Sequence, residues 1–258
     1  MSADGSVVAS GANLGNFGAG NSATASGGIV VFEYSTSFER WQQVGDIIPG
    51  SRVEENFGRR VAVSPNGKIV AGSGFQSALL PGVVRVYSYN PGNDKWEQRG
   101  QDLSGGDKFG QSLSLNSDGS ILVVGADRYQ DDFDESQVVV YRFNTAAGVW
   151  QQMGQTLDGE FPNDSIGWSV ELSVDGTILA TGAQEYDNDN GFNAGRVYVW
   201  IFDQTSGFWE PKGSVLDGIL AGGRFGFQVS LSSDGSTVAS AAAYGASPGN
   251  VRVFEYKA

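Results

Sequence analysis

The sequence of 258 residues contains neither cysteine nor histidine. Without cysteine the chain has no disulfide bonds, no thiolate metal sites and no cysteine nucleophile. Without histidine it lacks the commonest general base and metal ligand, and a Ser-His-Asp triad cannot form. Carboxylate pairs remain, because two carboxyl groups suffice to hydrolyse a glycoside. The sequence therefore predicts a protein that is not an enzyme, and a carboxylate-dependent glycoside hydrolase is the less favoured alternative.

Basic residues are also scarce, since 16 Lys and Arg stand against 29 Asp and Glu and the formal net charge is −13. This charge opposes binding to nucleic acid and to anionic membrane surfaces. No apolar run reaches the 18 residues expected of a membrane-spanning helix, so we expect no membrane insertion. Residues 1–5 carry neither a basic nor an apolar region, so we expect no signal peptide in this segment.

Glycine is abundant, with 38 residues against 7 of proline, which is typical of tight turns between short strands. Four features recur in order along the chain: a Phe-Gly pair (once Ile166-Gly167), an Asp-Gly or Asn-Gly turn, a strand with alternating aromatic residues, and a Trp followed four residues later by Gly. The structural residues of this repeat are Phe57, Gly58, Phe109, Gly110, Gly167, Phe225, Gly226, Trp41, Trp96, Trp150 and Trp209.

The spacing within the repeat is partly invariant. Nine residues separate the Phe-Gly glycine from the turn glycine in all four copies, as between Gly110 and Gly119, and nine separate the third-strand aromatic from the Trp, as between Tyr141 and Trp150. Two stretches vary in length: those between the second and third strands, and those from the fourth strand to the next Phe-Gly. We call these the variable loops. Because neighbouring strands are antiparallel, the variable loops should share one face, which in repeat proteins is often the binding face. Unconstrained drift of loop length is the alternative reading.

The second and third strands are almost entirely apolar, as in Ile121–Ala126, which indicates burial on both faces of each sheet. Sheets packed between two other sheets occur in β-propellers. We therefore predict an all-β propeller of about five four-stranded antiparallel blades in a single domain, 1–258, with repeat units near 1–56, 57–108, 109–165, 166–224 and 225–258. The first and last repeats are incomplete, giving 18 of 20 strands. Either the ring closes with a thinned blade or the chain is part of a longer propeller, and open strand edges could cause self-association.

The candidate binding residues lie in two acidic variable loops. They are Asp131, Asp132, Asp134 and Glu135 in the first loop, and Asp187, Asp189, Asn190 and Asn193 in the second. Calcium takes several oxygen ligands, so Asp187, Asp189 and Asn193 are a candidate calcium loop, although the terminal carboxylate of such loops is missing. A solvated acidic loop is the alternative, and no cofactor other than calcium is expected. Glu171 is the one carboxylate on a first strand near the axis. It is expected to line the channel, because catalysis would need a second carboxylate.

The repeat, for example Phe109-Gly110 with Val140-Tyr141 and Trp150, resembles the FG-GAP repeat of integrin α subunit heads, and its aromatic strand with a later Trp resembles kelch repeats. The FG-GAP resemblance implies a propeller, usually seven-bladed, with a role in adhesion at the cell surface or outside the cell. It also implies calcium loops between the first and second strands, but the turns of this chain are too short for them. We predict a binding or adhesion module that recognises a protein or a glycan through the variable loops. An intracellular kelch-like scaffold and an assembly segment of a longer propeller are alternatives.

Overall fold

The computed structural model describes residues 1–15, 26–75, 81–106, 108–126, 136–161, 164–243 and 248–257. The chain divides into two compact units, Met1–Ile121 with Phe143–Gln151 and Leu122–Arg142 with Gln152–Ala258, which are described separately below. The prediction of a single domain stays a prediction. No helix in the described ranges is long and apolar enough to span a membrane.

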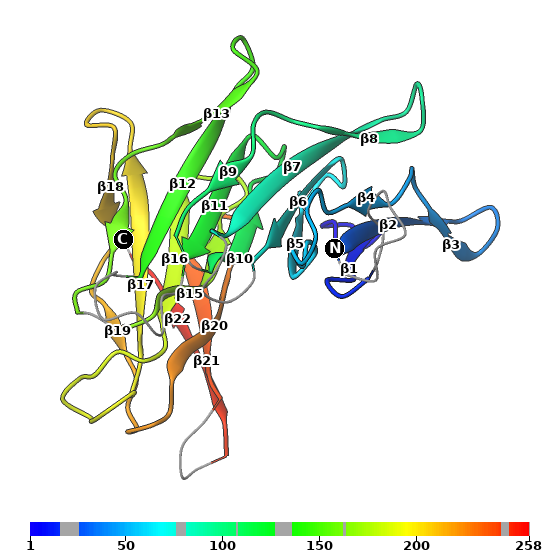
Figure 1. Ribbon diagram of the computed structural model, residues 1–258. Coiled ribbons are helices and arrows are strands. Elements are labelled where there is room, and N and C mark those ends of the chain that lie inside the picture. Colours follow the sequence, from blue (N-terminus) through cyan, green and yellow to red (C-terminus); the bar gives the residue numbers. More distant parts are fainter. Residues whose placement is uncertain are drawn as a thin grey trace. The chain divides into compact units, whose positions relative to one another are not determined.

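The first unit contains two antiparallel sheets of sequential strands. In one the order is β1-β2-β3, with β4 paired to β2; in the other it is β5-β6-β7-β8, with β9 paired to β7 (Figure 1). The strands are β1 (Val7–Gly11), β2 (Gly28–Ser35), β3 (Arg40–Gln43), β4 (Ile48–Pro49), β5 (Arg60–Val63), β6 (Ile69–Gly74), β7 (Val83–Asn90), β8 (Lys95–Gln98) and β9 (Leu103–Ser104). A third sheet has the order β10-β11-β12-β13 with β14 on β12, and the division between the units passes through it. Its strands are β10 (Phe109–Leu115), β11 (Ile121–Ala126), β12 (Gln137–Asn144), β13 (Val149–Gln152) and β14 (Leu157–Asp158).

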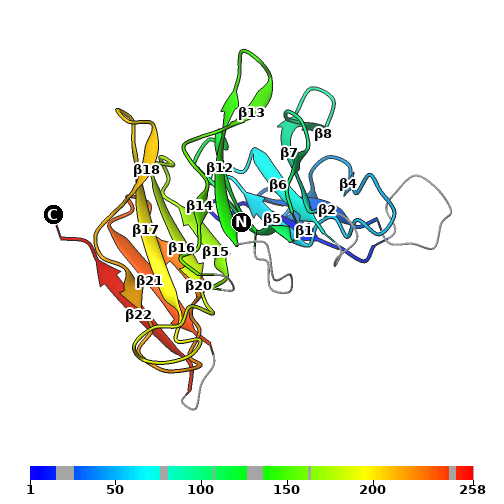
Figure 2. The ribbon, with the colours of Figure 1, turned by 60° about the vertical axis from the view of Figure 1, so that its left-hand side comes forward.

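The second unit contains the sheet β15-β16-β17-β18, with β19 on β17, and the three-stranded sheet β20-β21-β22 (Figure 2). The strands are β15 (Ile166–Leu172), β16 (Ile178–Ala183), β17 (Arg196–Asp203), β18 (Phe208–Pro211), β19 (Leu216–Asp217), β20 (Phe225–Leu231), β21 (Thr237–Ala242) and β22 (Asn250–Glu255). The five sheets thus follow the five predicted repeats, with three main-path strands in the first and the last. The prediction of repeated four-stranded antiparallel sheets is confirmed.

Four two-residue strands, β4, β9, β14 and β19, were not among the predicted strands. Each places an Ile or Leu seven residues after the repeat Trp, at Ile48, Leu103, Leu157 and Leu216. Each returns to the start of the third strand of its own sheet, as in the pairing of Val197 with Leu216. These short strands carry the chain from the outer edge of one sheet toward the beginning of the next repeat.

The Phe-Gly pair forms a buried irregularity in the first strand of the repeat. The aromatic rings of Phe57, Phe109 and Phe225 are fully buried, and the pairing register shifts between Phe225 and Gln228 as it does between Ile166 and Ser169. The glycine that follows Phe225 has a φ of 93°, and a Cβ there would lie 2.6 Å from the carbonyl oxygen of Arg196. Glycine is required at this position because the left-handed backbone and the close approach both exclude a side chain.

Each repeat Trp, from the second repeat onward, is seated against the preceding repeat. The indole nitrogen donates a hydrogen bond to a main-chain carbonyl there, and the ring lies on the glycine that follows that carbonyl. The three pairs are Trp96 on Val44 O and Gly45 (2.8 Å), Trp150 on Arg99 O and Gly100 (2.7 Å), and Trp209 on Met153 O and Gly154 (2.9 Å). We call each such carbonyl, its glycine and their surroundings a tryptophan slot. Burial of the indole and satisfaction of its N–H together link neighbouring repeats.

The invariant hairpin turns are also linked from one repeat to the next. In the first unit Ala3 N donates to Pro65 O at 2.9 Å and Asn66 N donates to Ser117 O at 3.3 Å; in the second unit Val174 N donates to Ser233 O at 2.9 Å. Asp and Asn side chains stabilise these turns, as where Asp175 Oδ1 accepts from Thr177 N. A change of length here would break contacts on both sides, which explains why this interval is constant.

Candidate functional site

The strongest polar constellation of the second unit lies among its variable loops and centres on Arg196, the first residue of β17. Its guanidinium holds Asp217 of β19 through two bonds, Nε to Oδ1 at 2.7 Å and Nη2 to Oδ2 at 3.1 Å. Its Nη1 also holds both carboxylate oxygens of Glu160, at 3.0 and 3.1 Å. Such paired contacts fix the guanidinium in one orientation. Arg196 therefore joins the loop after β14 to the strands β17 and β19.

Two tyrosines complete this site. Tyr186 donates its hydroxyl to Glu160 Oε2 at 2.9 Å and Tyr198 donates to Oε1 at 3.0 Å, while the guanidinium of Arg196 lies 3.8 Å from the centre of the Tyr186 ring. We call Glu160, Tyr186, Arg196, Tyr198 and Asp217 the Arg196 cluster. All five residues lie in the second unit, and each comes from a variable loop or from a strand that adjoins one.

The charges of the cluster stabilise one another. Burial alone would raise the pKa of Glu160, but the hydrogen bonds from Tyr186 and Tyr198 and the charge of Arg196 outweigh it and lower that pKa. Burial, followed by the bond to Glu160, raises the pKa of Tyr186 to about 12 and also raises that of Tyr198. Both tyrosines are therefore protonated hydrogen-bond donors at neutral pH, and Glu160 is an anion.

The loop that carries Glu160 is held by a buried carboxylate two residues before Ile166. Asp164 Oδ2 accepts from Glu160 N at 2.9 Å, and Oδ1 accepts from Ile166 N at 3.1 Å. Burial raises the pKa of Asp164, and these backbone bonds oppose that rise. The backbone around Glu160 is thus held in place before any ligand arrives.

A related but more buried cluster occurs in the first unit. Arg85 forms an ion pair with Glu55 and donates from Nε to Asp102 Oδ2 at 2.9 Å and from Nη2 to Ser51 Oγ at 2.7 Å. Glu55, like Asp164, lies two residues before the Phe-Gly position and accepts backbone N–H groups from the loop, here those of Ser51 and Arg52. Because Arg85 and Glu55 are both buried, this cluster serves the fold.

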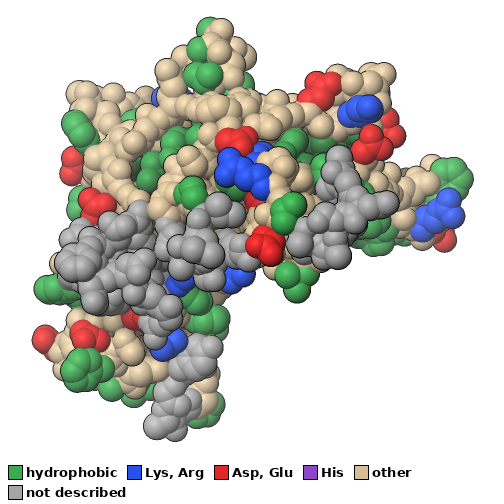
Figure 3. All heavy atoms as spheres, viewed as in Figure 1, with side chains coloured by type: hydrophobic (Ala, Val, Ile, Leu, Met, Phe, Trp, Pro, Cys, Tyr) green, Lys and Arg blue, Asp and Glu red, His purple; other side chains and the backbone are tan. Residues whose placement is uncertain are grey.

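The clusters differ in what they present to solvent. The side chain of Glu160 is 45% exposed, whereas that of Glu55 is 4% exposed. The aspartates of the two clusters, Asp217 and Asp102, are similarly exposed, at 37% and 40%. Four large apolar side chains of the neighbouring loops are exposed as well, and we call them the apolar rim: Phe161, Phe192, Ile219 and Leu220. Phe161 packs on Tyr186 with ring centres 5.8 Å apart. On the face drawn in Figure 3 acidic and basic side chains lie next to each other in small groups among apolar ones.

The predicted loop at 187–193 is closed by its own hydrogen bonds. Asp187 Oδ1 accepts from Asn193 N at 2.7 Å, and Asn190 Nδ2 donates to Gly218 O at 2.9 Å, whereas the Asp189 side chain is exposed. The structure thus brings Asp187 and Asn193 together and directs Asn190 to the neighbouring loop. No group of three acidic residues able to hold a metal ion is found among the described residues, and the calcium site stays a prediction.

The other predicted loop, with Asp131, Asp132, Asp134 and Glu135, lies outside the described residues. Glu171 lies on β15, opposite Ala180 of β16. Burial raises the pKa of Glu171 to about 7, with no contribution from another charged group of the described chain. A paired carboxylate would add such a contribution, so the geometry provides no support for glycosidase chemistry at Glu171.

The sequence pattern did not single out the Arg196 cluster, because its members come from three separate segments. One local signal was present: an acidic residue stands two positions before the Phe-Gly position at Glu55, Asp107 and Asp164. That spacing predicts a carboxylate that accepts hydrogen bonds from the backbone of the preceding loop. The residue four positions before each carboxylate, such as Glu160 before Asp164, would then have been a candidate site residue. The pairing of Arg196 with Asp217 follows from β19, which the sequence analysis missed.

Comparison with solved structures shows the same fold. A putative 6-phosphogluconolactonase from Bacteroides fragilis aligns with a TM-score of 0.54 at 16% identity, over 89% of this chain and 61% of its own. The periplasmic gluconolactonase PpgL of Pseudomonas aeruginosa aligns with a TM-score of 0.55 at 14% identity, over 93% of this chain and 66% of its own. The β-propeller domain of the Trilobed protease from Pyrococcus furiosus aligns with a TM-score of 0.48 at 11% identity, over 90% and 62%.

This chain therefore spans less than two thirds of each of these structures. No model of a protein family matches the sequence, and no curated protein matches it. The FG-GAP and kelch resemblances accordingly rest on the repeat residues alone. At these identities the structural likeness concerns the fold, and the fold is a β-propeller.

Proposed function

We propose that this protein is a non-catalytic recognition module that binds another protein through the variable loops of its second unit. The observation that carries the proposal is the Arg196 cluster with its apolar rim. Arginine, tyrosine and other aromatic side chains dominate the binding energy of protein interfaces. Here a fixed arginine and two tyrosines adjoin exposed rings, among them Phe192, which is 80% exposed. Apolar anchors beside an ordered charged group are typical of the centre of an interface.

A protein ligand is favoured over a glycan because the polar groups of the Arg196 cluster already form hydrogen bonds with one another. The guanidinium of Arg196 is already shared between two carboxylates, and the tyrosine hydroxyls already donate to Glu160. A glycan binds mainly through free hydrogen-bonding groups, whereas two of the rim residues, Ile219 and Leu220, are aliphatic. The charged groups of the Arg196 cluster are held in place and surrounded by the apolar rim, an arrangement that is complementary to a protein surface with both charged and apolar side chains.

Cell adhesion, at the cell surface or outside the cell, is the setting that the FG-GAP resemblance favours for this proposal. A hydrolase is not favoured, because burial alone raises the pKa of Glu171 and no charged neighbour among the described residues contributes to that rise. An intracellular scaffold remains the second candidate on the kelch resemblance. The identity of the captured protein, secreted or intracellular, distinguishes the two.

The test compares rim variants in a binding assay. Proteins captured by the wild-type chain from extracellular medium would be identified, and the Kd of the purified partner would be measured by biolayer interferometry. Phe161→Ser and Phe192→Ser should each weaken binding by roughly 30-fold, the size of a 2 kcal/mol hot spot. Phe38→Ser is the control, because Phe38 is an exposed ring of the first unit. Equal binding by all variants, or retention of glycans and not of proteins, contradicts the proposal.

A further inference from the structure

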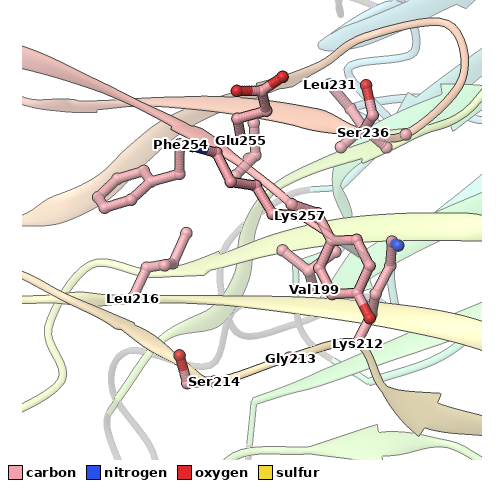
Figure 4. Close-up of a pocket in the computed structure, with 13 residues that line it drawn as sticks. Val199, Lys212, Gly213, Ser214, Leu216, Leu231, Ser236, Phe254, Glu255 and Lys257 are labelled. Carbon is pink, nitrogen blue, oxygen red and sulfur yellow. The ribbon is translucent and has the colours of Figure 1, made fainter.

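At three places along the chain a basic side chain of one repeat lies over the third-strand aromatic ring of the next repeat. The three pairs, with the distance from the charged group to the ring centre, are Arg99 over Phe143 at 4.3 Å, Arg142 over Phe202 at 5.7 Å and Lys212 over Tyr256 at 3.4 Å (Lys212 is drawn in Figure 4). The quadrupole of the ring attracts a cation in this position. Each of these rings therefore receives its cation from the chain itself.

The cation comes from one of two sequence positions of the repeat. The first is the residue immediately before the third-strand ring, as with Arg142, and the second is the third residue after the repeat Trp, as with Arg99. The first repeat has Glu33 and Val44 at these positions, so neither supplies a cation to the ring of the second repeat, Tyr89. A carboxylate thus replaces the cation where the first repeat faces the second.

A cavity of about 400 Å³ lies at this place in the first unit. Glu33 and Val44 line it from the first repeat, and Tyr89 and Asp94 line it from the second. Glu33 has no hydrogen bond or ion pair with any other residue of the described ranges. Arg40, the one basic residue of the β2–β3 hairpin, does not line the cavity. The cavity therefore combines open space, an aromatic ring and a carboxylate that has no basic partner in the described ranges.

Asp94 contributes a second carboxylate, and its position is fixed. Its Oδ1 accepts a hydrogen bond from the Tyr89 hydroxyl at 2.7 Å and another from Gly45 N at 3.0 Å. The φ of Asp94 is 55°, a left-handed conformation in which the third and fourth repeats have Gly148 and Gly207. Aspartate is among the few residues with a side chain that adopt this conformation readily. The second carboxylate is therefore absent from the later repeats and is held beside the ring before any ligand arrives.

We propose that the cavity lined by Glu33, Tyr89 and Asp94, which we call the Tyr89 site, binds an organic cation: a primary ammonium or guanidinium group in place of the missing basic side chain. The group lies over the Tyr89 ring, as Arg99 lies over Phe143, and forms ion pairs with the two carboxylates. The Tyr89 site is in the first unit. It shares no residue with the variable-loop site proposed above, and it has a different ligand.

The chemistry of the lining selects this class of ligand. The hydrogen bond to Asp94, then burial, and then the charges of Asp94 and Glu33 raise the pKa of Tyr89, so both carboxylates act at the same ring. Calcium would need several further oxygen ligands in place of the ring and of Val44. An ammonium or guanidinium group instead combines a charge that the ring attracts with N–H donors that carboxylates accept. A lysine or arginine side chain of a partner protein and a small free amine share this chemistry.

The later repeats supply the substitutions that test the site. Val44→Arg and Glu33→Arg place an arginine where Arg99 and Arg142 stand in the following repeats, so the chain would fill its own site. Each should weaken binding of an added cation at least about tenfold. Ser37→Arg is the matched control for Val44→Arg, because it adds the same charge at an exposed turn of the same hairpin without lining the cavity, and it should bind like the wild type.

Removal of either carboxylate gives a second set of variants. Glu33→Gln and Asp94→Asn should each weaken binding about fivefold, because each removes one ion pair with the ligand. The asparagine keeps an acceptor for the Tyr89 hydroxyl, so the loss concerns the charge. Glu39→Gln is the control, because Glu39 is exposed on the same hairpin and does not line the cavity. It should bind like the wild type.

The experiment is a ligand-observed NMR titration of the full chain with Nα-acetyl-lysine methylamide, Nα-acetyl-arginine methylamide and butylamine. Nα-acetyl-norleucine methylamide is the neutral probe. We expect saturable binding of the cations with a Kd of roughly 1 mM, and binding of the neutral probe at least about tenfold weaker. Binding of the capped residues assigns the ligand to a side chain of a partner protein, whereas binding of butylamine alone assigns it to a small free amine.

Absence of binding by all three cations, or equal binding of the lysine and norleucine probes, overturns the proposal. The same holds if Val44→Arg and Ser37→Arg bind alike, or if calcium binds at this site and the amines do not displace it. The melting temperature of every variant is measured alongside, and Glu33→Arg provides an independent test if Val44→Arg does not fold. A failure of rim variants in the variable-loop assay leaves all these outcomes unchanged, because the two sites share no residue.

Discussion

The half-buried carboxyl group of Glu171 should make the protein less stable as the pH rises from 5 to 8. The corresponding positions of the other three repeats, five residues after the Phe of the Phe-Gly pair, are Ala62, Ser114 and Ser230. Glu171 therefore places an ionisable group where the repeat otherwise has a small residue. The informative substitution is Glu171→Ser, which restores the residue of the neighbouring repeats.

The magnitude follows from the pKa. Burial raises the pKa of Glu171 from 4.5 to about 7. Since this pKa is raised in the folded state, the stabilisation from proton binding is fully present below pH 4.5 and is lost as the pH rises through about 7. At 1.36 kcal/mol per pKa unit, the free energy of unfolding should fall by roughly 3 kcal/mol over this range. Glu171→Ser removes the group, so its stability relative to the wild type should rise by the same amount.

The assay is urea denaturation of both proteins at pH 4, 6 and 8, followed by tryptophan fluorescence. The difference in unfolding free energy between variant and wild type is the quantity of interest, because other titrating groups cancel in it. Glu171→Gln should show the same trend with nearly unchanged side-chain volume. Glu210→Ser, at an exposed position of β18, is the control. If the difference for Glu171→Ser is the same at pH 4 and pH 8, the carboxyl group is not held in a desolvated site and the reasoning is refuted.

Two further predictions concern the slots and the acidic loop. Trp209→Ala should lower the free energy of unfolding by about 3–5 kcal/mol, as for other buried aromatics, while Trp41→Ala should lower it by less than about 1 kcal/mol, because Trp41 is exposed. Similar losses in chemical denaturation would show that seating in a slot is not what stabilises the repeat. If the loop with Asp187, Asp189 and Asn193 holds calcium as predicted, EDTA should lower the melting temperature and added calcium should restore it. An unchanged melting temperature in EDTA would contradict the predicted calcium site.

The sequence was sufficient to predict the sheets because their contacts repeat at fixed spacing. Three features require residues at fixed distances along the chain: the Phe-Gly bulge, the Asp-Gly turn and the seated Trp. Each feature therefore appears in the sequence as a constant spacing, which amino-acid composition alone would not produce. The same logic extends to the leucine of β14, Leu157, which lies seven residues after Trp150. That spacing is present in all four copies and would have predicted the short fifth strand.

The Arg196 cluster could not be predicted in this way. Arg196, Glu160 and Asp217 occupy positions that differ between repeats, and the variable loops place them together through tertiary structure. In the third strand, arginine stands at position 85 and tyrosine at the equivalent position 198, with Arg196 two residues earlier on the same face. A shift of two residues keeps the side chain on one face of the strand while changing its partners. A comparison of residue spacing within the repeats gives no information about such a shift of an arginine and its partners.

The contrast between constant and variable intervals along the repeat has a physical cause. Slots, bulges and turns are contacts between one repeat and the next, so a change of length in any of them disturbs two sheets at once. The variable loops close back on their own unit, as where Asn190 binds Gly218 O, and their length can change without loss of the sheet contacts. Recognition by the variable loops can therefore be specific to this protein, whereas the slots, bulges and turns are common to its repeats. Exchange of the 187–193 loop should consequently alter binding of the protein partner and leave the contacts between the sheets intact.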